Sequence, residues 1–325
     1  MDSSLCFPER ADSGIRGALS ALGLQQHGVA RRSNLTATGM TARAVDGMLL
    51  GGRWRAHGAV VVAMHNGPLT PDQQLWAAVL NAGPNAALAA RTAAAQHGLV
   101  GWPADCIELL VPRGTTVPKG LELPVKIHES RRFTVADLHP GRTLPQVRAE
   151  RALIDAAVWS SRPRTACGVL AAGVQQRLTT PAKLFSELDL AGAVRHRRLL
   201  AAALGDIAGG AQAVSEIDFL RFCRRNGLPK PLLQEVRVDA RGRRRYLDAT
   251  FRGRDGKLLR VEIDGALHLV VHTYWDDMSR GNEMVIDREQ VLRFPSYVIY
   301  ADDASALDQL RRALDLSGPR DARAC

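Results

Sequence analysis

Apolar residues recur along this chain with the period of a helix in some stretches and with the period of a strand in others. In residues 41–50, apolar Val45, Met48 and Leu49 stand three and four residues apart, which is the spacing of one helix face. In residues 261–264, apolar and acidic residues alternate, which is the period of a strand. A chain of 325 residues is long enough for two or three domains with their own cores. The sequence therefore predicts an α/β multidomain protein.

The stretch 21–66 has the succession of elements found in a winged helix-turn-helix domain. Residues 1–20 before it show no clear periodicity and are expected to form a loose arm or a short helix. The expected elements are a helix that ends at Gly28, a short helix over 30–37, a turn over 38–40, a helix over 41–50 capped by Thr41, and a two-stranded wing over 53–62 that turns near His57 and Gly58. Trp54 is expected to be a packing anchor of this domain.

Positive charge is concentrated in this first domain. Asp46 is the only acid between Leu24 and Val62. The basic residues of the same stretch are Arg31, Arg32, Arg43, Arg53 and Arg55. A recognition helix and a wing with this charge are suited to DNA phosphates. The stretch over roughly 20–65 also resembles the N-terminal domain of AbiEi-type antitoxins, which implies double-stranded DNA and a cognate toxin protein as expected partners.

Residues 68–208 are rich in alanine and are expected to form a mostly helical middle domain. Thr70 and Pro71 begin one helix with a favoured cap and a favoured first residue. Two strands are expected over 107–111 and 125–128, with a loop rich in glycine and proline between them. The other expected helices cover 86–96, 149–157, 169–176, 182–188 and 194–204.

The stretch 149–157 resembles a segment of the same antitoxin-like proteins. Its Glu150, Arg151 and Asp155 are expected to form structural ion pairs. Gly209-Gly210 is the expected boundary before the last domain, residues 211–325.

The expected chemistry lies on two neighbouring strands of this last domain, over 245–251 and 261–265. Asp248 lies on the first strand, and the turn over 253–257 would set it beside Glu262 on the second. Glu262 and Asp264 are two residues apart, so both lie on one side of their strand. Close carboxylates repel each other unless a cation is near, and Mg²⁺ prefers such oxygen ligands. The sequence therefore predicts that Asp248, Glu262 and Asp264 bind Mg²⁺ or Mn²⁺.

This arrangement resembles the PD-(D/E)xK nuclease superfamily, and Glu-x-Asp-Gly followed by His268 is similar to its Vsr-like branch. The resemblance covers much of 211–325, including Leu-Arg-Phe at 292–294, and implies a restriction-endonuclease-like core of order αβββαβα. It also implies that His268 acts as general base or holds the attacking water, and that Glu216 assists from a preceding helix.

Two departures from the superfamily concern charge and backbone. Asp264 stands where the superfamily usually has a lysine, so His268, Arg280 or Arg293 would have to supply the positive charge. Leu247 replaces the proline of the superfamily's name. The basic run 241–245, which contains Arg244, is either a solvated hairpin tip or a contact to the DNA backbone, and Arg280 is a second candidate for DNA binding.

Two functions follow from these patterns. The first is a metal-dependent DNA endonuclease that hydrolyses phosphodiesters. The second is a non-enzymatic DNA-binding regulator, similar to an AbiEi-type antitoxin or autorepressor, whose nuclease-like domain is inactive. If the three acids are only surface residues paired with arginines, the second function is favoured.

Composition and charge narrow the class of partner and the cellular location that we expect. Lys and Arg number 43 against 33 Asp and Glu, a net charge of +10, which favours a polyanionic partner. The net charge is +8 in residues 1–210 and +2 in 211–325. Five scattered cysteines with no CxxC pair argue against a zinc site or a disulfide framework. No membrane-spanning run and no secretory signal are evident, so a cytoplasmic protein is expected.

Overall fold

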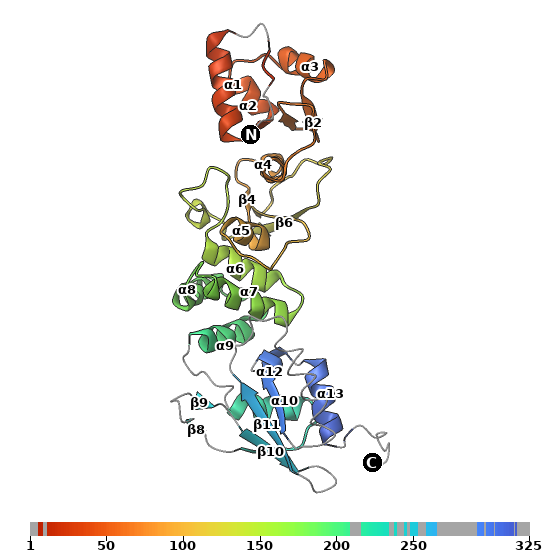
Figure 1. Cartoon of the computed structure of the whole chain (residues 1–325), viewed down its shortest axis with the longest axis vertical. Coiled ribbons are helices and arrows are strands. Elements are labelled where there is room, and N and C mark those ends of the chain that lie inside the picture. The colour runs from red at the N-terminus through yellow and green to blue at the C-terminus, as the bar shows by residue number, and fades with distance from the viewer. Residues whose placement is uncertain are drawn as a thin grey trace. The chain divides into compact units, whose positions relative to one another are not determined.

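The computed structural model describes residues 6–8, 12–208, 216–233, 237–238, 244–245, 248–252, 258–264, 291–295, 297–301, 303–314 and 316. The chain is a mixed α/β protein with two compact units, Met1–Ala152 and Leu153–Cys325 (Figure 1). An α/β chain with several helices and small sheets is therefore confirmed. None of the helices within the described ranges combines the length and apolarity required to cross a bilayer.

The first half of unit 1 contains three helices around a small antiparallel sheet with the strand order β1-β3-β2. Its elements are α1 (Ser13–Gln25), β1 (Val29–Arg31), α2 (Arg32–Ala37), α3 (Ala42–Leu50), β2 (Arg55–His57) and β3 (Val61–Ala63). The Thr41 hydroxyl accepts the N–H of Ala44 at 3.1 Å, which confirms the predicted cap of α3. Strands β2 and β3 confirm the predicted wing.

Two expectations for this part were wrong in detail. The segment expected to be a loose arm or a short helix contains most of α1, which is longer than expected and starts at Ser13 because the Asp12 carboxylate accepts the N–H of Ile15 at 2.8 Å. The short helix starts at Arg32 and not at Ala30, because fully buried Val29 and Ala30 pair with β3 as a strand.

Trp54 is the packing anchor of this part, as predicted. Its side chain is only 2% exposed and lies in one core cluster with Leu19, Leu35 and Met48. Its indole N–H donates to the carbonyl of Cys6 at 2.7 Å, so the buried ring keeps its polar atom satisfied.

The second half of unit 1 is built on a three-stranded sheet with the order β4-β5-β6, in which β5 and β6 are parallel. Its elements are α4 (Pro71–Ala82), β4 (Ala87–Leu88), α5 (Ala90–Gln96), β5 (Ile107–Pro112), β6 (Val125–Ser130), the 3₁₀ helix η1 (Val135–Asp137) and the start of α6 (Ala149–Trp159). Thr70 and Gln73 cap α4 reciprocally, as the Thr-Pro start predicts. The expected helix over 86–96 is a strand in its first residues, because Ala87 and Leu88 pair with β5.

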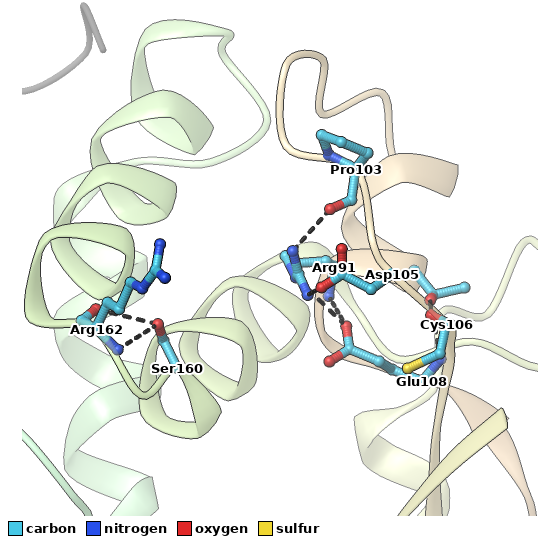
Figure 2. A network of polar contacts seen from close by, with 8 residues as sticks. Arg91, Pro103, Asp105, Cys106, Glu108, Ser160 and Arg162 are labelled. Carbon is cyan, nitrogen blue, oxygen red and sulfur yellow. Dashed lines mark hydrogen bonds and ion pairs between the residues drawn. The ribbon is translucent and has the colours of Figure 1, made fainter. Parts of the chain in front are cut away.

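Helix α5 begins with a cap that comes from another element. Ala90 has a φ of 45°, and its neighbour Ala89 has no polar side chain to act as N-cap. The buried carboxylate of Glu108 on β5 accepts the N–H of Arg91 at 2.9 Å. The guanidinium of Arg91 in turn donates to Asp105 at 3.0 Å and to the carbonyl of Pro103 at 2.7 Å (Figure 2). Burial raises the pKa of Glu108, and the N–H of Arg91 opposes that shift.

Arg151 forms a structural ion pair, as predicted. Its guanidinium lies 3.1 Å from the carboxylate of Asp137, and both residues are buried. The same carboxylate accepts the N–H of Thr134 at 2.8 Å. The pair therefore ties the start of α6 to η1 within unit 1.

Unit 2 contains helices packed on a four-stranded sheet with the order β12-β11-β10-β7. Its elements are α7 (Pro163–Gln175), α8 (Pro181–Ala191), α9 (Arg197–Ile207), α10 (Glu216–Arg225), β7 (Leu232–Leu233), β8 (Arg237–Val238), β9 (Arg244–Arg245), β10 (Asp248–Arg252), β11 (Leu258–Asp264), β12 (Val291–Pro295), α12 (Tyr297–Ala301) and α13 (Ala304–Ala313). Strand β10 is antiparallel to β7 and β11, and β12 is parallel to β11.

One apolar core joins the helices of unit 2 to its sheet. Cys167 of α7 and Leu199 of α9 belong to the same cluster of buried residues as Phe251 of β10, Val261 of β11 and Phe294 of β12. Helices α7 and α9 are therefore part of the body that carries the C-terminal strands. The expected boundary at Gly209-Gly210 lies outside the described residues.

Gly173 marks a close approach of two helices in unit 2. A Cβ atom added at Gly173 of α7 would lie 2.5 Å from Cδ1 of Leu153, which is fully buried. We expect Gly173→Ala to lower the free energy of unfolding by about 1–3 kcal/mol, because the core has to shift to admit one methyl group. Urea denaturation measures this change.

The control is Gly17→Ala in exposed α1, where nothing lies within 4 Å of an added Cβ. This substitution is expected to stabilise the protein by roughly 0.5–1 kcal/mol. Equal effects of the two substitutions would show that the helices do not meet at Gly173.

His128 makes unit 1 sensitive to acid. Burial, with Lys126 as a smaller cause, lowers the pKa of His128 to about 4. The unfolded chain takes up a proton near pH 6.5, so stability is lost as the pH falls from 6.5 towards 4. We expect wild type to lose up to about 1 kcal/mol per pH unit relative to His128→Gln over this range. Urea titrations at pH 7 and pH 4.5 measure the difference, and an unchanged difference between the two proteins would contradict the prediction.

Candidate functional site

The two acidic strands are neighbours, and their register sets Asp248 opposite Glu262. Strands β10 and β11 pair antiparallel with Asp248 and Glu262 as direct partners. Direct partners share one face of an antiparallel sheet, and Asp264, two residues on, occupies the same face of β11 by the strand period. Val261 and Ile263 of β11 are buried in the core on the opposite face. The predicted pairing of Asp248 with Glu262 across two strands is confirmed.

A third strand brings a positive charge to Glu262. Arg293 of β12 is the parallel register partner of Glu262. Its Nε lies 2.8 Å from Oε2 of Glu262, and the side chains are 56% and 21% exposed, respectively. Of the three cations named from the sequence as substitutes for the missing lysine, Arg293 thus reaches this carboxylate.

The remaining predicted site residues are placed less completely. His268 and Arg280 lie outside the described residues. Glu216 is the first residue of α10, and Arg244 lies in β9 as the partner of Val238 in β8. Arg244 and Arg245 therefore lie on one strand of an antiparallel pair, and residues 239–243 lie outside the described part.

The acidic face has the donor chemistry of a hard cation site. Asp248, Glu262 and Asp264 offer only carboxylate oxygens, which Mg²⁺ and Mn²⁺ prefer. Among the side chains that the structure describes, no three His, Cys, Asp or Glu are close enough together to hold a metal ion. The residue types and the register fit a divalent cation, with Arg293 as a competitor for Glu262.

The N-terminal part, which was predicted to be a winged helix-turn-helix, presents three of its five predicted arginines to solvent. Arg43 on α3 and Arg53 and Arg55 at the wing are exposed. Arg32 forms an ion pair with Asp46 of α3, so its charge is balanced within the domain. Arg31 is half-buried in β1.

Small residues surround Arg43 on α3. Val45 and Met48 face the core. Exposed Ala42, Ala44 and Gly47 leave the outer face of the helix with few large side chains. A helix face with small side chains can approach a groove of DNA closely, and Arg43 would supply the positive charge on this face.

The turn of the wing is held by a loop of the same unit. Gly58 has a φ of 71°, and a Cβ added there would lie 3.1 Å from the backbone nitrogen of Leu121 and 3.2 Å from the carbonyl carbon of Gly120. The ring of His57 beside it is half-buried, and burial together with Arg55 lowers the pKa of His57. The exposed residues Arg53 and Arg55 precede this turn in the sequence.

Comparison with solved structures includes a weak likeness. No protein-family model and no curated protein matches the chain. The crystal structure of the Rv2827c protein from Mycobacterium tuberculosis is similar with a TM-score of 0.38 and 19% sequence identity, over 63% of this chain and 80% of that chain. A TM-score of this size does not establish a shared fold.

The ion pair between Glu262 and Arg293 is expected to contribute little to stability. Because Arg293 is more than half exposed, we expect a coupling energy of about 0.2–1 kcal/mol in a double-mutant cycle of Glu262→Gln and Arg293→Gln. Urea denaturation of the four proteins measures it. The matched control is the exposed pair of Arg312 and Asp308, at 2.9 Å, where about 0.3–0.5 kcal/mol is expected. A coupling of several kcal/mol at Glu262 would show that the pair is mainly a structural element.

Proposed function

We propose that this protein binds double-stranded DNA through its N-terminal winged helix-turn-helix part and hydrolyses phosphodiester bonds at the acidic strands of unit 2. The observation that carries the proposal is the register that makes Asp248 the direct partner of Glu262, with Asp264 on the same strand. Acids brought together across two strands repel each other, and a bound cation would offset that repulsion. The resemblance to Vsr-like PD-(D/E)xK nucleases supports the same reaction.

Asp248, Glu262 and Asp264 would hold Mg²⁺ or Mn²⁺ in this proposal. When bound, such an ion supplies an activated water and neutralises charge on the scissile phosphate. His268 would take the proton of the attacking water as general base, and Glu216 would assist from α10. The guanidinium of Arg293, which already lies at this face, would stabilise negative charge on the phosphate.

A second function is favoured by the same ion pair. Arg293 neutralises one oxygen of Glu262 without any metal ion, as expected if the sheet has kept its acids as structural partners of arginine. The protein would then be a non-enzymatic DNA-binding regulator, similar to an AbiEi-type antitoxin, with a cognate toxin as its protein partner. Exposed Arg43, Arg53 and Arg55 suit DNA binding in both functions.

Plasmid cleavage distinguishes the two functions. We expect wild type to nick supercoiled plasmid with Mg²⁺ or Mn²⁺ and not with EDTA. Asp248→Asn and Glu262→Gln are expected to reduce the rate at least a hundredfold, because each removes a charged metal ligand. Gel electrophoresis of the plasmid over time measures the rate.

The control is Asp308→Asn, which removes an exposed carboxylate of α13 and should leave the rate unchanged. If wild type binds its own promoter tightly but leaves the plasmid intact with both metals, the endonuclease proposal is wrong and the regulator remains.

A further inference from the structure

Unit 2 carries a second concentration of positive charge, away from its acidic strands. Residues 159–198 contain seven Lys and Arg and two Asp and Glu, a net charge of +5. The basic residues are Arg162, Arg164, Arg177, Lys183, Arg195, Arg197 and Arg198. This net charge exceeds the +2 of the whole stretch 211–325, so these helices can attract an anion.

One acid of this stretch is buried, and the other forms an ion pair with Arg197. Glu187 is buried in α8, with 4% of its surface exposed. Asp189 pairs with Arg197 at 2.7 Å, and Arg197 also donates to the carbonyl of Gly192 at 3.0 Å. Arg197 thus neutralises the carboxylate and caps the end of α8. Its neighbours Arg195 and Arg198 are exposed, and no carboxylate in the described part of the chain forms an ion pair with either.

A histidine joins this arginine pair to a third arginine. Burial and the charge of Arg195 lower the pKa of His196, and the backbone of Ser160, which lies beside the ring, opposes that shift. The hydroxyl of Ser160 accepts the N–H of Arg162 at 3.3 Å and donates to the carbonyl of Arg162 at 3.1 Å (Figure 2). The segment before α7 therefore lies beside the segment before α9. Exposed Arg162 joins Arg195 and Arg198 in one basic corner, a name used here for these three residues and the first turns of α7 and α9.

Backbone N–H groups in the first turns of both helices add donors to the same corner, except at Pro163, which has no N–H. The N-cap residues, Arg162 for α7 and His196 for α9, make no side-chain cap hydrogen bond. The first N–H groups of an α-helix have no partner within the helix, and the helix dipole makes that end positive. Guanidinium groups and helix N-termini together are the groups that contact phosphates in protein–DNA complexes.

The basic corner is firmly connected to the acidic sheet. Leu199 follows Arg198 directly and belongs to the core cluster that contains Val261 of β11 and Phe294 of β12. A duplex held at the corner would therefore be held by the same packed body that carries Asp248 and Glu262.

We propose that the basic corner binds the phosphate backbone of double-stranded DNA, as a contact of unit 2 that is separate from the winged helix-turn-helix. The contact reads charge and not sequence, since guanidinium–phosphate contacts carry no base information. This inference rests on the proposed DNA binding but needs no cleavage.

Salt-dependent binding tests the basic corner. Full-length protein is titrated in EDTA onto a fluorescent 30-base-pair duplex of random sequence, with anisotropy read between 50 and 200 mM KCl. The variant is Arg195→Gln/Arg198→Gln. We expect about tenfold weaker binding at 100 mM KCl and a salt slope smaller by about 2, since each lost phosphate contact removes roughly 0.9.

Two controls make the result specific. Arg177→Gln/Lys183→Gln removes the same charge from exposed positions near the other end of α7, and it should leave the slope within about 0.5 of wild type. Arg195→Lys/Arg198→Lys keeps the charge and should restore most of the binding, which separates lost phosphate contacts from misfolding. Equal loss in the two glutamine variants, or no loss in either, would overturn the inference.

A fourth variant separates this inference from the proposed function. Arg43→Gln/Arg53→Gln tests the winged helix-turn-helix alone. If this variant binds like wild type while the corner variant does not, the basic corner stands and the proposed role of the N-terminal part fails. If wild type binds no duplex at 50 mM KCl, both fail together.

Discussion

The candidate chemistry of this protein depends on the register between β10 and β11. A slip of one residue would exchange the two faces of the strand and place Glu262 and Asp264 in the core. The apolar residues prevent the slip, because Val261 and Ile263 are buried with Phe251. The burial of these residues therefore fixes the positions of the acids on the other face. The same constraint applies to β12. Because Phe294 is buried on one face of this strand, its neighbour Arg293 lies on the other face, where it contacts Glu262.

Much of the local structure could be predicted from sequence because its causes are local. Thr41 and Thr70 mark the starts of α3 and α4 by their own hydroxyls. The alternation in β11 and the late strand β12 were readable from the period of apolar residues. The pairing of Asp248 with Glu262 was also predictable, because only a short turn separates their strands.

The errors came from partners distant in sequence. The sequence near Ala90 contains no signal for the start of α5, because the cap of this helix is the carboxylate of Glu108 on another element. Arg32 was predicted to contact DNA, and its ion pair with Asp46 was not foreseen. The approach of Ser160 to His196 was likewise not predicted, because no periodicity shows that two helix starts lie side by side. Side-chain partners set by tertiary packing are what pattern analysis cannot supply.

The contact between Gly58 and Gly120 has a consequence for comparisons with related chains. The two backbones meet there with no side chain between them, and both glycines have positive φ. Any larger residue at position 58 would push the two loops apart and redirect the strand that carries Arg55. In a homologous chain, a side chain at this position would therefore require the loop around Gly120 to lie farther from the turn between β2 and β3.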